Sequence, residues 1–253
     1  MTVSVSALIP HYNHSFAVEK VIGALREAGL EVLVVDDASD ATHRERLIRM
    51  AGPAVRVLHR DVNGGKGAAV LDGLRTAWLN GFTHVLQIDA DGQHDTGDIP
   101  RLLAEAKAHP EAIVTAVPLF DADAPRSRVL GHGFAAFWVG IETLSFRPPD
   151  TMCGFRVYPL RPVLAVLGCY RPGRRMSFDV EVLVRSNWDG IEIRQLPSRV
   201  SYPVDGVSHL RPFRDNLLIT LTHVRLLAGM LLRLPRLAAR SYRPGGGPGE
   251  AGK

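Results

Sequence analysis

The chain has 253 residues and a net charge of +4, with 46% hydrophobic and 22% charged residues, which suits a globular protein of one ordinary α/β domain or two small ones. Its two cysteines, Cys153 and Cys169, have neither a CxxC nor a zinc-type spacing, which excludes a disulfide framework and favours reduced thiols in a cytosolic protein. Few aromatic residues lie among the basic ones, so nucleic acid is not an expected partner.

The first part of the chain alternates short apolar runs with longer amphipathic ones. It enters a strand-like run at once, without the basic and long apolar regions of a signal peptide, so we predict no such peptide. The predicted strands are Val3–Ile9, Val32–Val35, Val55–Leu58, His84–Ile88 and Ala112–Val117. The predicted helices are Phe16–Ala28, Ala41–Met50, Gly67–Leu79 and Ile99–Ala108. This alternation indicates βαβ units and a largely parallel sheet.

After about Pro118 the pattern is less regular. We expect, in chain order, a helix at Arg126–Leu144, a strand at Thr151–Tyr158, a helix at Phe178–Asn187, strands at Ile191–Leu196 and Arg199–Tyr202, a long helix at Phe213–Leu234 and a flexible tail at Arg243–Lys253. We therefore predict an α/β domain of residues 1–212, an amphipathic C-terminal helix over 213–242 and a tail over 243–253.

Polar residues follow three of the predicted strands. They are Pro10, Tyr12 and Asn13 after the first, Asp36 and Asp37 after the second, and Asp89 and Asp91 after the fourth. Parallel sheets bind ligands outside the carboxyl ends of their strands, so these residues should share one rim. Two carboxylates one residue apart can both reach a Mg²⁺ or Mn²⁺ ion alongside diphosphate oxygens. A solvated loop often carries the same DxD pattern, and the position at the sheet edge favours the metal site.

The stretch Asn63-Gly64-Gly65-Lys66-Gly67 precedes a predicted helix. Glycines allow a backbone to come close to a phosphate or base, and a helix N-terminus attracts anions. The stretch is not a P-loop, because the first glycine of that motif and the Ser or Thr after its lysine are missing. An ordinary glycine turn before a helix is the alternative.

Four motifs in order, IPHYN, VVDDAS, NGGKGAA and DADGQH, resemble the motif series of family-2 glycosyltransferases, which are inverting enzymes with the GT-A fold, Rossmann-like and mostly parallel. The later stretches TMCGFRVY, SFDVEVLVRS and YPVDGVSHLR are most similar to the polyprenyl-phosphate (dolichyl-phosphate type) transferases in that family. The resemblance covers about residues 4 to 212.

The resemblance implies roles for individual residues. The nucleotide sugar is expected to contact Pro10, Tyr12, Asn13, Asp37, Lys66, Gly67, Asp89, Ala90 and Asp91. It implies further that Asp89 and Asp91 hold a Mg²⁺ or Mn²⁺ ion that bridges the donor diphosphate, with Gln93 completing the shell. His209 and Arg211 match family positions near the phosphates, and Arg126 and Arg128 match more loosely. Each arginine could instead be a solvated surface charge.

The implied reaction moves a sugar from a UDP- or GDP-linked donor to an acceptor oxygen. A second acidic pair, Asp179 and Glu181, contains the candidate general base, and Glu181 fits the family position better. A lipid or polyprenyl-phosphate acceptor is already ionised and needs no strong base, so the pair could then position metal or acceptor. Acids favoured by the helix dipole at a helix N-terminus are the structural alternative.

The C-terminal part is basic, with nine Lys/Arg against three Asp/Glu from Arg199 onward. In Phe213–Leu234, leucines recur at helical spacing, and His223 and Arg225 make a membrane-spanning segment a poor interpretation. A helix lying on an anionic membrane and a helix packed on protein fit equally well. The expected location is cytoplasmic, at the inner face of the cell membrane in the first case.

Three other functions stay open at this level. The first is a glycosyltransferase with a non-lipid hydroxyl acceptor. The second is a sugar nucleotidyltransferase, which usually carries a glycine- and arginine-rich loop after its first strand, where this chain has PHYNHS. The third is a catalytically inactive binding module, against which both acidic pairs argue.

Overall fold

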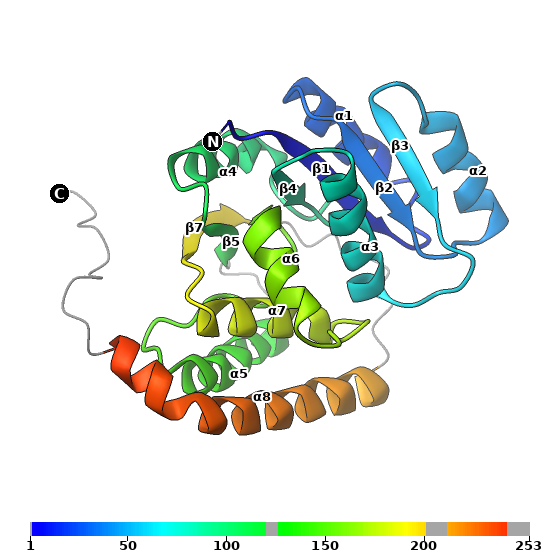
Figure 1. Ribbon diagram of the computed structural model, residues 1–253. Coiled ribbons are helices and arrows are strands. Elements are labelled where there is room, and N and C mark those ends of the chain that lie inside the picture. Colours follow the sequence, from blue (N-terminus) through cyan, green and yellow to red (C-terminus); the bar gives the residue numbers. More distant parts are fainter. Residues whose placement is uncertain (1, 120–125, 201–211, 242–253) are drawn as a thin grey trace.

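The computed structural model describes residues 2–119, 126–200 and 212–241. Within them, one mixed sheet of seven strands lies between layers of helices (Figure 1). The strands, in the spatial order β3-β2-β1-β4-β6-β5-β7, are Val55–His59, Val32–Asp36, Val5–His11, His84–Gln87, Arg156–Pro159, Ile113–Leu119 and Ile193–Arg199. Only β6 runs against its neighbours, pairing antiparallel with β4 and β5. The predicted α/β class and mostly parallel sheet are confirmed.

Helices cover both faces of the sheet. The helices of the first half are α1 (Val18–Glu27), α2 (Ala41–Met50), α3 (Lys66–Leu79), the 3₁₀ turn η1 (Thr96–Asp98) and α4 (Ile99–Ala108). In α1, Val18, Val21, Ile22 and Leu25 form an apolar face that is buried on the sheet together with residues of α2 and α4. The opposite face of the sheet is covered by α3, α6 (Leu160–Gly168) and α7 (Ser177–Trp188).

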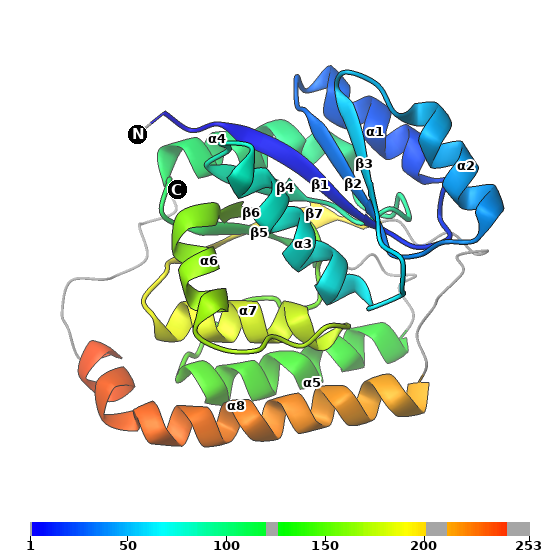
Figure 2. The same ribbon diagram turned by 45° about the vertical axis from the view of Figure 1, so that its right-hand side comes forward.

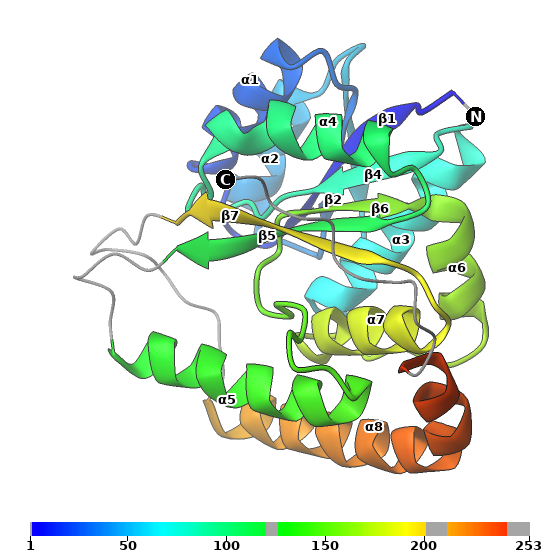
Figure 3. The ribbon, with the colours of Figure 1, turned by 90° about the vertical axis from the view of Figure 1, so that its left-hand side faces the viewer.

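A further layer lies beyond α7. It consists of α5 (Arg126–Thr143) and α8 (Pro212–Ser241), which lie side by side (Figures 2 and 3). Buried residues of α5, α7 and α8, among them Val139, Val184 and Leu226, form a separate small core. Helix α7 contributes to the core on the sheet and to the core with α5 and α8, so it lies between the sheet and the two outer helices.

The first half of the chain agrees closely with the predicted elements. In the second half, the helices predicted at Arg126–Leu144, Phe178–Asn187 and Phe213–Leu234 are confirmed as α5, α7 and α8, whereas other elements differ. Helix α6 was not expected, and the strand predicted at Thr151–Tyr158 shrinks to β6 because residues 151–155 form a loop. The two strands predicted at Ile191–Leu196 and Arg199–Tyr202 are replaced by one, β7, which ends at Arg199, while residues 201 and 202 lie outside the described residues. Helix α8 extends beyond the predicted Phe213–Leu234 and contains Pro235, and the predicted tail lies outside the described residues.

Candidate active site

The carboxyl ends of β2, β1 and β4 lie next to one another, as the sequence predicts. His11 pairs with Asp36 in the sheet register, and the amide of Asp37 donates to the carbonyl of His11 at 2.8 Å. On the other side of β1, the amide of Ile88 donates to Leu8 at 3.0 Å, immediately before Asp89. The three polar strand ends therefore form one continuous rim.

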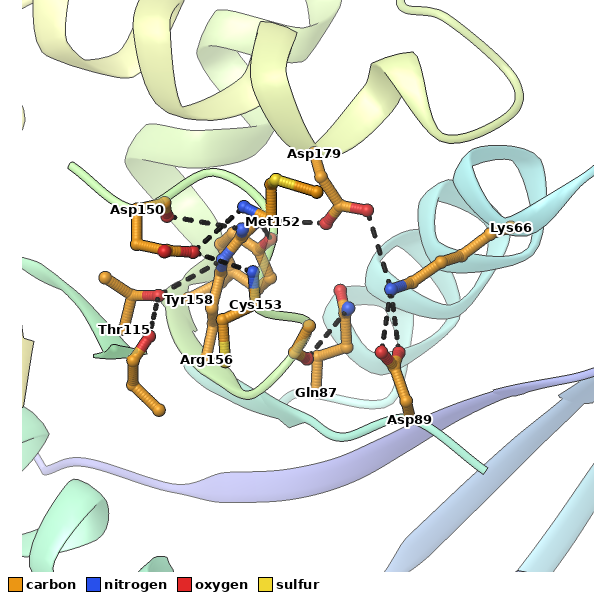
Figure 4. Close-up of polar contacts among 12 residues, drawn as sticks. Lys66, Gln87, Asp89, Thr115, Asp150, Met152, Cys153, Arg156, Tyr158 and Asp179 are labelled. Atoms are coloured by element: carbon orange, nitrogen blue, oxygen red, sulfur yellow. Dashed lines mark hydrogen bonds and ion pairs between the residues drawn. The ribbon is translucent and has the colours of Figure 1, made fainter. Parts of the chain in front are cut away.

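Lys66 holds the first acid of the DxD motif. Its Nζ lies 2.8 Å from Asp89 Oδ1 and 3.0 Å from Oδ2 (Figure 4). His94 Nε2 lies 3.6 Å from Asp89 Oδ2. Burial alone would raise the pKa of Asp89, but Lys66 and His94 hold it well below its usual range. Burial also works against the charge of His94, yet its hydrogen bonds with Asp89 and Cys153 raise the pKa of His94 to about 10. Asp89 is therefore an ionised carboxylate between two cationic groups.

The same lysine reaches the second acidic pair. Lys66 Nζ lies 3.5 Å from Asp179 Oδ2, and Arg156 Nη1 donates to Asp179 Oδ1 at 2.9 Å (Figure 4). Burial opposes the charge on Lys66, but Asp179 and Asp89 keep the pKa of its ammonium above its ordinary value. Four side chains thus form a row in which the sign of the charge alternates. They are Asp89 after β4, Lys66 of α3, Asp179 of α7 and Arg156 of β6. Each of these charges has an oppositely charged neighbour, so removing one of them would leave a buried charge without its partner.

Asp179 and Glu181 point in different directions. Residues two apart on a helix lie on different sides of it. Asp179 faces Lys66 and Arg156, whereas Glu181 Oε2 accepts a hydrogen bond from the amide of Gly173 at 2.7 Å and is buried. The preference for Glu181 as the general base stays a prediction, and Asp179 is the acid of this pair that lies beside Lys66 and Arg156.

The glycine loop before α3 is held by Asp37. The amides of Gly64 and Gly65 donate to its two carboxylate oxygens at 2.9 and 2.6 Å, and Arg60 forms an ion pair with it. Gly65 has a φ of 93°, which a residue with a side chain rarely adopts. At Gly67 a Cβ would strike Phe178, so the start of α3 packs directly on the start of α7. Asp37 and Gly67 are buried, and their expected contacts with the nucleotide remain a prediction.

Two features of the site were not predicted from the sequence. Arg156 is fully buried, and the signal that could have revealed it is a single charge inside the apolar run FRVY. Gly154 is the second, because a Cβ there would strike both carboxylate oxygens of Asp89. Its loop is ordered by Asp150 Oδ1, which accepts from the amides of Met152 and Cys153 at 2.9 and 2.8 Å.

A buried cluster behind the rim also escaped sequence analysis. His11 Nδ1 lies 3.1 Å from Asp36 Oδ1, and His59 Nδ1 lies 3.0 Å from Oδ2. Burial would raise the pKa of Asp36, but hydrogen bonds with His11, Ser39 and His59 hold it well below its usual range. The cluster ties β1, β2 and β3 together at their carboxyl ends.

The remaining predicted site residues are placed as follows. Pro10 is buried in β1, Tyr12 and Asn13 follow that strand, and the Asn13 side chain exchanges hydrogen bonds with Asp40. Ala90 is buried between the two acids of the DxD motif. Arg126 and Arg128 lie in the first turn of α5, but their side chains are outside the described part of the chain, as are His209 and Arg211 entirely.

The donor atoms present fit a divalent cation that takes most of its ligands from elsewhere. Asp89 Oδ1 is buried and forms an ion pair with Lys66, and Asp91 Oδ1 accepts a hydrogen bond from the amide of Gln93 at 3.1 Å. Over the same residues, no three His, Cys, Asp or Glu side chains converge on one point. A small number of carboxylate oxygens suits a Mg²⁺ or Mn²⁺ ion whose coordination shell is completed by phosphates and water. It does not suit an ion whose ligands all come from the protein.

A basic cleft of about 750 Å³ lies on the other side of the glycine loop. Its walls are the β3–α3 connection, the segment before α7 and helix α8, which contributes Leu218, Leu221 and Arg225. Arg174, Arg175 and Arg225 line it, and none of the three forms an ion pair with an acidic side chain in the described ranges. Asp61 and Asp72 also line the cleft, and Asp72 is paired with Arg60. The cleft therefore has an excess of positive charge and an apolar wall.

Comparison with known proteins identifies the class. The model of glycosyl transferase family 2 matches residues 6–179. The undecaprenyl-phosphate mannosyltransferase of Micrococcus luteus is 42% identical over 103 residues, which are 39% of this chain and 42% of that protein. The polyprenol monophosphomannose synthase of Mycolicibacterium smegmatis is 34% identical over 101 residues, 38% of each chain. Each match therefore spans less than half the length of the relative.

Solved structures agree on the fold. The glucosyl-3-phosphoglycerate synthase of Mycobacterium tuberculosis, bound to phosphoglyceric acid, gives a TM-score of 0.62 at 15% identity, covering 89% of this chain and 80% of that one. Its complex with Mn²⁺, UDP-glucose and phosphoglyceric acid gives 0.59 at 16% identity, covering 90% and 79%. The fold and the acidic rim define a GT-A protein. The chain belongs to glycosyl transferase family 2 and is a glycosyltransferase.

Proposed function

We propose that this glycosyltransferase moves a sugar, with inversion, from a nucleoside diphosphate sugar to a lipid-linked phosphate of the polyprenyl type. The observation that carries the proposal is the alternating chain Asp89–Lys66–Asp179–Arg156 at the rim of the sheet. Positive charge fixed beside a helix N-terminus is suited to neutralise a diphosphate as it leaves. The two matched prenyl-phosphate mannosyltransferases point to the same substrates.

In this proposal the donor lies along the rim formed by β1, β2 and β4, with UDP and GDP both open as its nucleotide. Asp89 and Asp91, with Gln93 nearby, would hold a Mg²⁺ or Mn²⁺ ion, which when bound supplies positive charge to the diphosphate. Lys66 turns from its ion pair with Asp89 toward the same phosphates. The acceptor oxygen attacks the anomeric carbon from the opposite side, through a transition state with oxocarbenium character.

The basic cleft supports an anionic acceptor with an apolar tail. Arg174, Arg175 and Arg225 offer an excess of positive charge, and Leu218 and Leu221 offer apolar surface in the same cleft. A phosphate acceptor is ionised near neutral pH, so Asp179 would then position groups rather than abstract a proton. For a non-lipid hydroxyl acceptor, the second candidate, Asp179 would be the general base. We place the reaction at the cytoplasmic face of the cell membrane.

The test is a panel of UDP- and GDP-sugars incubated with Mn²⁺ and three acceptors: a polyprenyl phosphate, the corresponding neutral polyprenol and a short sugar with free hydroxyls. Release of nucleoside diphosphate together with a glycosylated polyprenyl phosphate supports the proposal. Turnover only with a hydroxyl acceptor favours the second candidate, and no binding of any donor favours an inactive module. A nucleotidyltransferase is tested in a separate incubation with UTP or GTP and a sugar 1-phosphate, from which it would form the nucleotide sugar and release pyrophosphate. Asp89→Asn serves as the inactive control.

The acceptor site is tested separately with Arg174→Ser combined with Arg225→Ser. This variant should raise the KM for polyprenyl phosphate about tenfold or more, because two charge-assisted contacts are lost. Its donor hydrolysis should stay near that of Arg49→Ser, a control on the exposed face of α2. An unchanged KM for the lipid would remove the cleft from the acceptor site.

A further inference from the structure

The outer helices α5 and α8 expose large apolar side chains. On α5, Leu130, Phe134 and Phe137 are 73%, 64% and 61% exposed, and their spacing puts them on one stripe of the helix. On α8, Leu231 and Leu232 are 58% and 84% exposed. Side chains of this size and exposure, gathered on neighbouring helices, indicate an interaction surface rather than scattered surface residues.

The two exposed sets adjoin each other through Trp138. Its ring contacts those of Phe134 and Phe137 edge-on, with centroids 6.2 and 5.7 Å away, and lies 6.2 Å from the ring of His223 in α8. His223 Nδ1 is in turn 2.7 Å from Glu142 Oε1, so a buried pair fastens α8 to α5. The helices lie side by side at one end of the molecule (Figures 2 and 3). We refer to Leu130, Phe134, Phe137, Val224, Leu231 and Leu232 as the outer apolar face.

The charges around this face have one sign. The exposed charged residues of the described part of α8 are Arg225, Arg233 and Arg236, and the sequence has no Asp or Glu from residue 216 to residue 249. In α5 the only acid is Glu142, which is buried. A second copy of the chain would bring these arginines against one another, whereas a surface of negative charge and apolar interior would satisfy both features.

We propose that the outer apolar face docks on an anionic lipid bilayer, with Phe134, Phe137, Leu231 and Leu232 entering the headgroup boundary and Arg233 and Arg236 of α8 contacting lipid phosphates. Residues Leu218–Ala239 are long and apolar enough for a membrane span, and only 22% of the segment is buried. Its three arginines and its packing on α5 and α7 favour a helix lying along the surface. The docking surface thus includes α5, which the sequence pattern of the C-terminal helix alone does not reveal.

The experiment measures co-sedimentation of the full chain with vesicles of phosphatidylglycerol and phosphatidylcholine, and with vesicles of phosphatidylcholine alone. Neither contains an acceptor, so the result does not depend on the proposed function. Wild type should bind the anionic vesicles and lose binding as salt increases, because screening weakens the arginine contacts. Phe134→Ser with Phe137→Ser, and separately Leu231→Ser with Leu232→Ser, should each weaken binding about tenfold or more.

Leu79→Ser is the matched control, since Leu79 is equally apolar, highly exposed and located at the end of α3. It should bind vesicles like wild type, and all variants should keep the thermal unfolding temperature and donor hydrolysis of wild type. Wild-type vesicle binding by both double variants would overturn the proposal. So would a wild-type chain that ignores vesicles but sediments as a dimer, which the same substitutions convert to a monomer.

Discussion

Lys66 contacts both carboxylate oxygens of Asp89, at 2.8 and 3.0 Å, so the first acid of the DxD motif is neutralised by the chain's own cation. A bound diphosphate donor and its divalent ion would offer each member of this pair a new partner of opposite charge. The Lys66 ammonium could then pair with the phosphates, and the Asp89 carboxylate could bind the metal ion. If the proposed donor complex separates Lys66 from Asp89, we expect the binding of metal and the binding of donor to depend on each other.

Replacing Lys66 with Met should separate two roles of the lysine. Transfer should fall by about 10²–10³, since a cation aimed at the leaving diphosphate is lost. In the absence of donor, however, Mn²⁺ should bind more tightly than to wild type, because the ammonium no longer occupies Asp89. Isothermal titration with Mn²⁺ alone, followed by a donor turnover assay, measures both effects.

Lys107→Met is the control for this experiment, because Lys107 is exposed in the last turn of α4. It should leave both quantities at wild-type values. Weaker Mn²⁺ binding by Lys66→Met would show that the lysine supports the metal site instead of competing for it.

The two acids of α7 should respond differently to amide substitution. In Asp179→Asn the ion pairs with Arg156 and Lys66 are lost, and transfer should fall by at least about 10², with a stability cost of about 3–5 kcal/mol for the unpaired buried charge. In Glu181→Gln the side-chain oxygen can still accept from Gly173, so most of the transfer should remain. Steady-state rates and thermal unfolding of both variants decide the matter. Loss of transfer in Glu181→Gln with an unchanged fold would restore Glu181 as the general base.

This difference shows how far the sequence could predict the site. The motifs placed polar residues at three strand ends, and the order of strands and helices up to Val117 followed from apolar runs and helical spacing. Helix geometry also requires that Asp179 and Glu181 face apart. Which of them faces Lys66 depends on how α7 packs, and packing brings together residues more than a hundred positions apart in the chain. No local pattern contains that information.

The missed elements have equally physical causes. Helix α6 begins directly after β6, and Pro159 and Pro162 at its start resemble a turn in sequence. Proline is tolerated in the first turn of a helix, where its missing amide has no partner to lose. The apolar face of α5 was hidden for another reason. Its exposed phenylalanines alternate with glycines and alanines, and only the neighbouring helix α8 makes them part of a surface.

Gly154 should be sensitive to the smallest possible addition. Gly154→Ala places a methyl group against both carboxylate oxygens of Asp89 and should displace them from Lys66. A shift of about 1 Å at a catalytic group can cost about 10² in rate, and overpacking costs about 1–3 kcal/mol. Gly168→Ala, at the end of α6, meets no atom within 4 Å and is the control. A wild-type rate of donor turnover in Gly154→Ala would contradict the prediction, because it would mean that the added methyl group does not displace Asp89.

The buried cluster of Asp36 with His11 and His59 should make the fold sensitive to acid. Because the folded-state pKa of Asp36 lies well below its ordinary value of 3.8, its stabilising effect is complete above that value and is lost as the pH falls further. At neutral pH the free energy of unfolding of Asp36→Asn should therefore be about 1–3 kcal/mol lower than that of wild type, because hydrogen bonds are lost. The difference in the free energy of unfolding should shrink as the pH falls from about 4 to about 2. Thermal unfolding across this pH range, with the exposed Asp189→Asn as the control, measures the difference. Parallel curves for wild type and Asp36→Asn would mean that Asp36 is not the group through which acid loosens the ends of β1, β2 and β3.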